Sequence, residues 1–317
     1  MRRNIMITGG AGNIGGSLAR RLVKNTDNYV VIVDNFLTGT MEKLPSRQNK
    51  NWRFIKADVN SRSDILAVMT SMNFDYVFHY AAVVGVRRTL ENPALVLRDI
   101  HGIENILDLS KNTGVKRAFF SSSSEVYGEP FEMPQREDTT PLNSRLPYAI
   151  VKNVGEAFFK SYKQEYGLDY SIFRFFNTYG PLQSTDFVIS KFLAQAMAGE
   201  DLTIYGDGSQ TRTFCHVSDN LDFTERALYD NRGLNETINV GSAEEYTILE
   251  LAEMIIQLAG TKSKITHLPA LKEGDMARRR PDVSRMLAIL GRPLMTLEDG
   301  IRDVIARAQG QGKMPSY

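Results

Sequence analysis

N-I-M-I-T-G-G-A-G-N-I-G-G, from Asn4 to Gly16, is the stretch that decides the fold. An apolar run passes directly into glycines spaced three residues apart, at Gly9, Gly12 and Gly15, and a helical pattern follows. Such a strand, turn and helix leave backbone N–H groups and the positive end of the helix dipole facing a pyrophosphate. The first glycine permits the tight turn, the second lets the phosphates approach the backbone, and the third lets helix and strand pack closely.

A carboxylate follows at the distance that such a site requires. The apolar run from Tyr29 to Val33 ends in Asp34, about 20 residues beyond the glycines. This acid is expected to bind both hydroxyls of an adenosine ribose, and it would repel a ribose phosphate. The glycines alone would be compatible with an ordinary glycine-rich turn, but together with the strand, the helix and Asp34 they predict a dinucleotide site. NAD is favoured over NADP.

Composition excludes several classes of protein. The chain has 317 residues, enough for one large or two modest domains, and its 38 basic and 37 acidic residues nearly balance. No charge excess points to nucleic acid or to an anionic membrane as a partner. Cys215 is the sole cysteine, so no intramolecular disulfide can form, which fits a reducing compartment. No apolar run approaches the ~18–20 residues of a membrane span, and we expect a cytoplasmic protein.

Strand and helix patterns alternate through residues 1–180. This alternation predicts an α/β fold, a Rossmann-type doubly wound parallel sheet with helices on both faces, with further strands near 52–59, 75–82 and 117–121 and one helix over 92–113. From residue 181 the regular alternation of strand and helix patterns ends. Residues 181–317 are expected to form mainly a smaller substrate-binding lobe, with about 236–250 returning to the Rossmann sheet. Ligands then belong at the carboxyl ends of the parallel strands.

Two predicted strand ends have more than one interpretation. Asp58 and Val59 are placed to contact the edge and face of an adenine, but a cap for a helix beginning near Ser63 explains Asp58 comparably well. His79 ends the next strand, and no second metal-type residue lies at ligand spacing from it. We therefore expect His79 to be a packed or hydrogen-bonded side chain, and we expect no metal site.

Tyr148 and Lys152 lie at the start of a predicted helix, at a spacing that puts both side chains on the same face. A phenol with a pKa of about 10 is a poor base at neutral pH, but an ammonium about one turn away and a positive cofactor ring would favour the phenolate. Tyr148 can then take the proton from a substrate hydroxyl as hydride leaves for a nicotinamide. This spacing is common by chance, so the hypothesis depends on the dinucleotide site.

The run S-S-S-S-E-V-Y-G begins at Ser121 and supplies further candidates. Ser123 is the candidate for a hydrogen bond to the same substrate hydroxyl, whereas a turn or solvated loop is the alternative for Ser121 and Ser122. Glu125 stands beside a site that would make a ketone, where a carboxylate can remove or deliver a proton at the neighbouring carbon. An exposed loop acid remains the alternative for Glu125.

Together these motifs resemble the extended short-chain dehydrogenase/reductases, the NAD-dependent nucleotide-sugar epimerase, dehydratase and decarboxylase family. The resemblance covers nearly the whole chain and rests on T-G-G-A-G-N-I-G, V-D-N, A-D-V, H-Y-A-A, S-S-S-S-E-V-Y-G, Y-A-I-V-K, R-F-F-N-T-Y-G-P, and Y-G-D-G-S-Q-T-R-T-F with V-S-D. It implies a tightly held NAD, oxidation at carbon 4 of a nucleotide-linked sugar, chemistry on the keto intermediate and often return of the hydride. It also implies a homodimer that pairs two long helices from each subunit.

The resemblance also implies a set of site residues. The expected catalytic residues are Tyr148, Lys152, Ser123 and Glu125. The residues expected to contact NAD are Gly9, Gly12, Asn13, Ile14, Gly15, Asp34, Asn35, Asp58, Val59, Ala81, Ala82, Tyr148 and Lys152. The residues expected to contact the nucleotide sugar are Val84, Ser123, Ser124, Asn177, Arg212 and Arg279. Asn177 would lie near the diphosphate, Arg212 would bind it through its fixed donor fork, and Arg279, from the cluster at 278–280, would reach the nucleotide or sugar.

The particular reaction is indicated less sharply. Asn13 and Asp99 depart from the family pattern, which usually has an aromatic residue and an asparagine there. Glu125 resembles dehydratases and uronate decarboxylases more than simple 4-epimerases. Ser124 resembles decarboxylases and some GDP-sugar dehydratases, and D-M-A-R-R-R-P-D resembles decarboxylases. A-A-V-V-G-V-R-R-T-L-E-N-P resembles epimerases and dehydratases.

We expect a 4,6-dehydratase acting on an NDP-hexose, with a nucleotide-sugar 4-epimerase or a UDP-glucuronate decarboxylase as alternatives. The non-enzyme alternative is an NAD-sensing regulatory protein. Such proteins generally lose the tyrosine or lysine of the active site, and this chain retains both.

Overall fold

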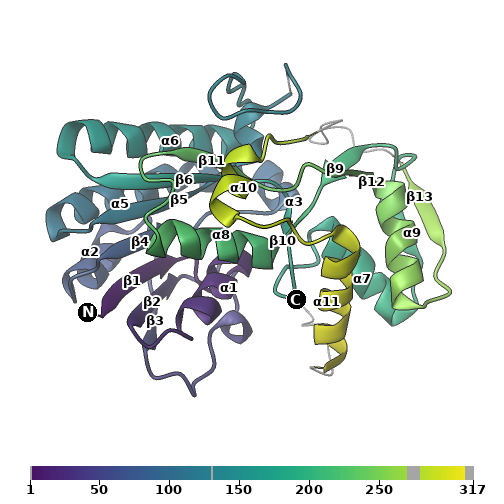
Figure 1. Ribbon diagram of the computed structural model, residues 1–317, viewed down its shortest axis with the longest axis horizontal. Coiled ribbons are helices and arrows are strands. Elements are labelled where there is room, and N and C mark those ends of the chain that lie inside the picture. Colours follow the sequence, from purple (N-terminus) through teal and green to yellow (C-terminus); the bar gives the residue numbers. More distant parts are fainter. Residues whose placement is uncertain (1, 130, 270–278, 311–317) are drawn as a thin grey trace. The chain divides into compact units, whose positions relative to one another are not determined.

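The computed structural model describes residues 2–129, 131–269 and 279–310 (Figure 1). The chain divides into two compact units. The first unit contains residues 1–128, 142–175 and 224–238, and the second contains residues 129–141, 176–223 and 239–317. Each unit therefore takes its residues from separated parts of the chain.

The first unit is built around a seven-stranded sheet. Its strands are β1 (Arg3–Thr8), β2 (Asn28–Asp34), β3 (Trp52–Lys56), β4 (Tyr76–His79), β5 (Arg117–Ser123), β6 (Asp169–Phe175) and β11 (Thr237–Val240). They lie in the order β11-β6-β5-β4-β1-β2-β3, and the pairs from β6 to β3 are all parallel. The order reverses direction at β1, which pairs with β2 on one side and β4 on the other. This topology confirms the predicted Rossmann-type sheet and puts the ligand crevice at the carboxyl ends of β1 and its neighbours.

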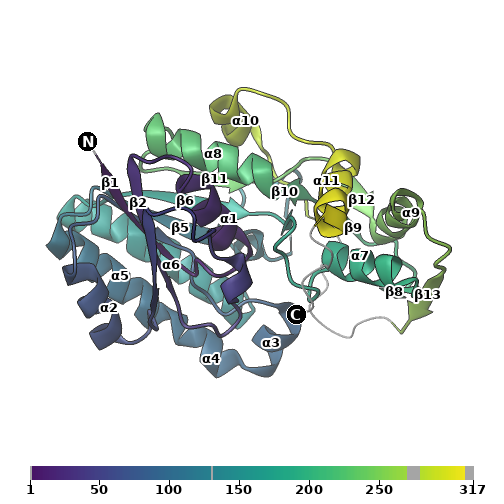
Figure 2. The ribbon, with the colours of Figure 1, turned by 90° about the horizontal axis from the view of Figure 1, so that it is seen from below.

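Helices cover both faces of this sheet (Figure 2). They are α1 (Asn13–Leu22), α2 (Arg62–Thr70), α3 (Val86–Glu91), α4 (Pro93–Leu97), α5 (Asp99–Thr113), α6 (Pro147–Tyr166) and α8 (Val217–Tyr229), with short 3-10 turns η1 (Met41–Lys43) and η2 (Ser124–Tyr127). α2, α5 and α6 share one apolar core with the alternate strand residues Met6, Val31 and Val33. α1 packs on β1 and β2 from the other face. The period of two along each buried strand decides which side chains meet which layer.

The single helix predicted over 92–113 is wrong in one respect. α4 ends at Leu97 and α5 begins at Asp99, with Arg98 between them. Arg98 keeps helical dihedral angles of −64° and −23°, and the amides of Arg98 and His101 bond three residues back, to Leu95 and Arg98. The chain thus tightens locally without changing direction sharply, which leaves the apolar period intact and hides the break from the sequence.

The second unit is smaller and mixes short sheets with helices. Its elements are β7 (Thr178–Tyr179), α7 (Val188–Ala198), β8 (Leu202–Tyr205), β9 (Thr211–Thr213), β10 (Cys215–His216), β12 (Glu245–Thr247), α9 (Ile248–Ala259), β13 (Ile265–Leu268), α10 (Ser284–Leu290) and α11 (Leu297–Gly310). Within the described residues the pairs are β7 with β10, β9 with β12 and β8 with β13. α7, α9 and α11 bury their apolar faces in one core. The capping box of Thr247 and Glu250 begins α9.

A buried ion pair joins α6 to the sheet. Arg174 on β6 donates from Nε to Oε1 of Glu156, at 2.8 Å, and from Nη2 to Oε2, at 2.6 Å. Both side chains are only 1% exposed. Ser122 at the end of β5 donates to Oε1 of Glu156, and Arg174 donates to the Tyr127 hydroxyl of η2 at 2.7 Å. The network therefore fixes β5, β6, η2 and α6 to one another.

Removing the cation of this pair should destabilise the protein strongly. Arg174→Met leaves the Glu156 carboxylate buried without its partner, and we expect a loss of about 3–5 kcal/mol in the free energy of unfolding by urea. The double variant Glu156→Leu/Arg174→Met removes the stranded charge and should recover part of that loss. Equal losses in the single and double variants would contradict this explanation.

Candidate active site

The glycine turn lies between β1 and α1. Gly9 has φ of 67°, and a Cβ there would lie 2.6 Å from the backbone nitrogen of Ala81, so the close approach of the β4 loop requires glycine. A Cβ at Gly15 would collide with the Gly9 carbonyl oxygen. Gly12 is the N-cap of α1, and no side chain of the described residues caps this helix. The first N–H groups of α1 are thus left for an anion, which fits the pyrophosphate of a dinucleotide.

Asp34 connects the end of β2 to this turn. Its Oδ2 accepts a hydrogen bond from the Ala11 amide at 3.0 Å, and its Oδ1 accepts one from the Phe36 amide at 2.8 Å. Phe36 has φ of 63° and stacks on Phe54 with ring centroids 4.8 Å apart. Asn35 is exposed beside it. The carboxylate is therefore held at the strand end next to the glycines, as a ribose ligand must be.

At the end of β3, Asp58 does not cap the following helix, α2. α2 begins at Arg62, and its N-cap is Ser61, whose hydroxyl accepts from the Asp64 amide. Asp58 instead accepts from the Asn60 amide at 2.9 Å, and Val59 is buried. Asp58 and Val59 are thus left at the carboxyl edge of the sheet, where an adenine contact stays a prediction.

His79, at the end of β4, is confirmed as a buried, hydrogen-bonded side chain. Its Nδ1 lies 2.9 Å from the Thr8 hydroxyl, which also accepts from the Ala81 amide at 3.2 Å. Burial, helped by the Lys152 charge, lowers the pKa of His79 to about 3. The imidazole is therefore neutral at ordinary pH. Ala82 and Val84, in the same loop, are partly exposed.

Tyr148 and Lys152 lie in the first turn and a half of α6, which begins at Pro147. Lys152 is 2% exposed, and its Nζ donates to the Ser121 carbonyl at 2.6 Å. The same Nζ lies 5.7 Å from the centroid of the Tyr148 ring and 5.0 Å from that of Phe120. Burial lowers the pKa of Lys152 to about 8, against the opposing charge of Asp99. An ammonium is thus held beside the phenol that is proposed to lose a proton.

The serine run forms the end of β5 and the start of η2. Ser121 lies in β5, as the strand predicted over 117–121 requires, and Ser122 lies in β5 as well, so the turn or loop alternative is wrong for both; Ser122 is a buried donor to Glu156. Ser123 and Ser124 are buried, and the Ser123 hydroxyl accepts from the Glu125 amide at 3.2 Å. Glu125 is partly exposed in η2. The strand end thus brings the serines, Glu125 and the Lys152 contact into one region.

Three predicted substrate residues belong to the second unit. Asn177, with φ of 34°, donates from Nδ2 to the Thr213 carbonyl at 2.9 Å. Arg212 lies on β9 and donates from Nη1 to the Thr211 carbonyl at 2.7 Å. Arg279 is buried, with 6% of its surface exposed, whereas Arg278 lies outside the described residues. Their contact with a nucleotide sugar stays a prediction.

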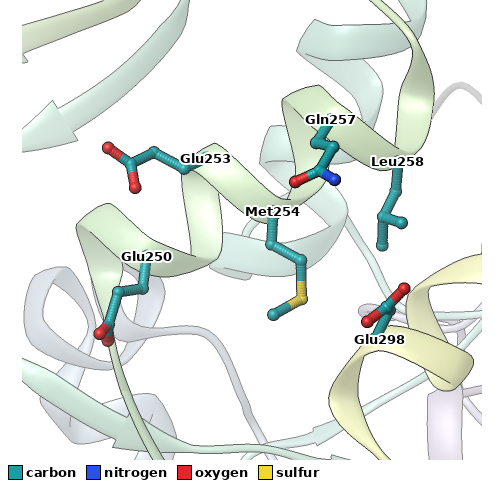
Figure 3. Close-up of a pocket in the computed structure, with 6 residues that line it drawn as sticks. All are labelled: Glu250, Glu253, Met254, Gln257, Leu258 and Glu298. Atoms are coloured by element: carbon teal, nitrogen blue, oxygen red, sulfur yellow. The ribbon is translucent and has the colours of Figure 1, made fainter.

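The second unit also contains a pocket of about 260 Å³ between α9 and α11 (Figure 3). It is lined by Glu250, Glu253, Met254, Gln257, Leu258 and Glu298. No predicted site residue lines it. Across the described parts of the chain, no three or more His, Cys, Asp or Glu side chains are grouped to hold a metal ion, and no helix is long and apolar enough to cross a membrane.

One residue of the site region, Glu156, was missed by sequence reasoning. Glu156 follows Lys152 at the same spacing that separates Lys152 from Tyr148, which places all three on one stripe of α6. That repeated spacing was the available signal. Arg174 is the first residue of the R-F-F-N-T-Y-G-P motif, but its pairing with Glu156 was not predicted.

The fold and this site define a dinucleotide-binding α/β enzyme with a tyrosine and lysine pair in the first two turns of α6. The sequence model of the "NAD dependent epimerase/dehydratase family" matches residues 5–241. The chain therefore belongs to that family, and NAD is its cofactor.

Relatives and solved structures agree with this assignment. The chain is 36% identical to a UDP-N-acetyl-alpha-D-glucosaminuronate decarboxylase of Bacillus cytotoxicus, over 96% of this chain and 97% of the relative. It is 35% identical to UDP-glucuronic acid decarboxylase 1 of Danio rerio, over 96% of this chain and 72% of the relative. A UDP-glucose 4-epimerase of Thermotoga maritima, solved with UDP-glucose, matches with a TM-score of 0.91 and 29% identity, over 98% of this chain and 100% of that chain.

Acid should weaken the fold through His79. The pKa of His79 is about 3 in the folded protein and 6.5 ordinarily, so below pH 6.5 the unfolded chain binds a proton that the folded protein does not. The contribution of His79 to the free energy of unfolding is therefore complete above pH 6.5 and is lost as the pH falls toward 3. We expect the stability advantage of the parent protein over His79→Asn to shrink by about 2 kcal/mol between about pH 7.5 and about pH 5, measured by urea unfolding. The matched substitution at the exposed His101 should show no such narrowing. A constant advantage at His79 would contradict the neutral, buried imidazole.

Proposed function

We propose that the protein oxidises carbon 4 of a UDP-hexuronate and decarboxylates the resulting keto sugar. The observation that carries the oxidation is the buried Lys152 ammonium, held by the Ser121 carbonyl and 5.7 Å from the ring of Tyr148. The decarboxylation is supported by Ser124 and Glu125 and by the relatives that act on UDP-uronates. This choice departs from the dehydratase that the sequence alone favoured.

The first half of the reaction uses the end of β5 and the start of α6. Bound NAD supplies the hydride acceptor and can later return the hydride. The Tyr148 phenolate takes the proton of the carbon 4 hydroxyl, and the Lys152 charge stabilises that phenolate. Ser123, fixed by the Glu125 amide, donates a hydrogen bond to the same sugar oxygen. The product is a ketone at carbon 4.

The second half follows from the position of the substrate carboxylate. With a ketone at carbon 4, the carbon 6 carboxylate is that of a β-keto acid. The bond between carbons 5 and 6 breaks, carbon dioxide leaves, and the electron pair becomes an enolate across carbons 4 and 5. The Tyr148 hydroxyl and Ser123 hydrogen-bond the enolate oxygen. Carbon 5 then requires a proton, and we assign its delivery to Glu125.

A 4,6-dehydratase is the second candidate, and Glu125 is the residue that favours it. On an NDP-hexose the same carboxylate would remove the carbon 5 proton and pass it to the carbon 6 hydroxyl, which leaves as water. Both reactions share the first oxidation. The substrate, a uronate or a hexose, separates them.

Mass spectrometry of products from UDP-uronates and from UDP-, dTDP-, GDP- and CDP-hexoses tests the proposal. We expect loss of carbon dioxide from a UDP-uronate, and a kcat about 10²–10⁴-fold lower in Tyr148→Phe. Loss of water from a hexose would favour the dehydratase, and epimerisation without mass change a 4-epimerase. No turnover and no reduction of NAD with any sugar would overturn the enzymatic proposal in favour of an NAD-sensing protein.

Glu125→Gln should separate the two halves of the reaction. With a UDP-uronate, the absorbance of the reduced cofactor should still rise, while release of the decarboxylated product slows about 10²-fold because carbon 5 lacks its proton donor. Glu129→Gln, an exposed acid in the same segment, is the matched control and should leave both signals unchanged. If Glu125→Gln also turned over at the parent rate, another group would have to protonate carbon 5.

A further inference from the structure

Asp99 is a buried carboxylate that the proposed chemistry does not use. It is the first residue of α5 and is 7% exposed. Its Oδ2 accepts from the Val83 amide at 2.7 Å, and its Oδ1 accepts from Nδ2 of Asn60 at 3.2 Å. A carboxylate removed from water without a cation is costly, so its surroundings should contain a compensating charge.

The packing of α5 against α6 places the charge of Lys152 near Asp99. The two helices lie on the same face of the sheet and lead into the neighbouring parallel strands β5 and β6, so they run in the same direction. They touch where a Cβ on Gly155 would lie 3.0 Å from Cδ1 of Ile103. Asp99 is about one turn before Ile103, and Lys152 is about one turn before Gly155. The two charged side chains therefore lie at the same level of adjacent helices.

The electrostatics of both groups agree with this geometry. Burial raises the pKa of Asp99, while the Val83 and Asn60 hydrogen bonds and the Lys152 charge lower it, and Asp58 raises it further. Burial lowers the pKa of Lys152, and Asp99 is the carboxylate that opposes this effect. His79 faces the same lysine but is neutral, because its pKa is about 3. Tyr148 also lies beside Lys152, and Glu156 follows it one turn along α6, paired with Arg174.

We propose that Asp99 is a positioning residue that keeps Lys152 charged and, through the same carboxylate, fixes the loop after β4 at Val83. It touches neither substrate nor cofactor in this role, and acts through Lys152. The inference deepens the proposed function, because a charged Lys152 is what makes Tyr148 a base at neutral pH. It couples the glycine-turn side of the site, where the β4 loop packs on Gly9, to the helix that carries Tyr148.

Asp99→Asn tests the effect of the charge separately, because the amide can keep the hydrogen bond that fixes the loop at Val83. Its Oδ1 can still accept from Val83, so the loop is retained. Asn60 can rotate its amide to accept from the new NH₂ group, since its Oδ1 is buried without a hydrogen-bond partner. The substitution therefore removes the charge and leaves the hydrogen bonds available.

Lysine ¹⁵Nζ NMR titration of the full chain without ligand measures the effect directly, with Lys152→Met to assign the signal. We expect Asp99→Asn to lower the titration midpoint of Lys152 by about one pH unit or more. Asp108→Asn, which removes a carboxylate from the exposed side of the same helix, is the matched control and should leave the midpoint in place. An unchanged midpoint in Asp99→Asn, with the Val83 amide signal intact, would overturn the proposal.

The reciprocal measurement covers the case in which Asp99→Asn disturbs the loop. In Lys152→Met, Asp99 and its hydrogen bonds remain, and the aspartate ¹³Cγ titration should show a higher midpoint for Asp99. No rise there would also contradict the proposal. In the active enzyme, the alkaline limb of the pH profile should move to lower pH in Asp99→Asn. The NMR measurements need no sugar, so failure of the proposed reaction would leave them decisive.

Discussion

The ion pair of Glu156 with Arg174 is the contact on which the candidate site depends. Two charges are removed from water and are hydrogen-bonded in return: two Arg174 nitrogens and Ser122 bond the carboxylate, and Arg174 also bonds Tyr127. A pair so fully hydrogen-bonded can offset its desolvation where a looser one could not. The four members of this network come from β5, η2, α6 and β6, so it holds the elements that carry the serines, Glu125 and Tyr148.

The three residues on one stripe of α6 differ in burial and in charge. Tyr148 is partly buried, Lys152 is 2% exposed, and Glu156 is 1% exposed. The two buried residues are an anion paired with Arg174 and a cation with a lowered pKa, and the partly buried one is the phenol that we propose exchanges a proton with the substrate. His79 adds no charge to this set, because burial keeps it neutral. The phenol therefore experiences one nearby cation whose charge depends on pH.

Sequence reasoning succeeded where the decisive interactions are local. The glycine turn, the position of Asp34 at a strand end, and the placement of Tyr148 and Lys152 on one helix each follow from a short segment, and the strand pattern predicted the doubly wound sheet. The roles of these residues stay predictions. It failed where the partner is distant. Glu156 precedes Lys160 at the spacing of an exposed helix pair, and nothing nearby reveals that Arg174, on β6, is its main partner. Ser122 was misassigned for the same reason, and the break at Arg98 was hidden because its dihedral angles stay helical.

In the proposed reaction, the oxidation and the step that follows it use different groups. Oxidation at carbon 4 would use groups held in place by the buried pair, at the end of β5 and in the first turns of α6. The fate of the ketone would depend on what faces carbons 5 and 6, and among the first-unit candidates we assign that place to Glu125 in η2. Because Tyr127 anchors η2 through Arg174, the Glu125 backbone is rigid while its side chain is partly exposed. One carboxylate in a fixed place can then deliver a proton to carbon 5 after decarboxylation or remove one before dehydration, so the substrate's own carbon 6 group decides the outcome.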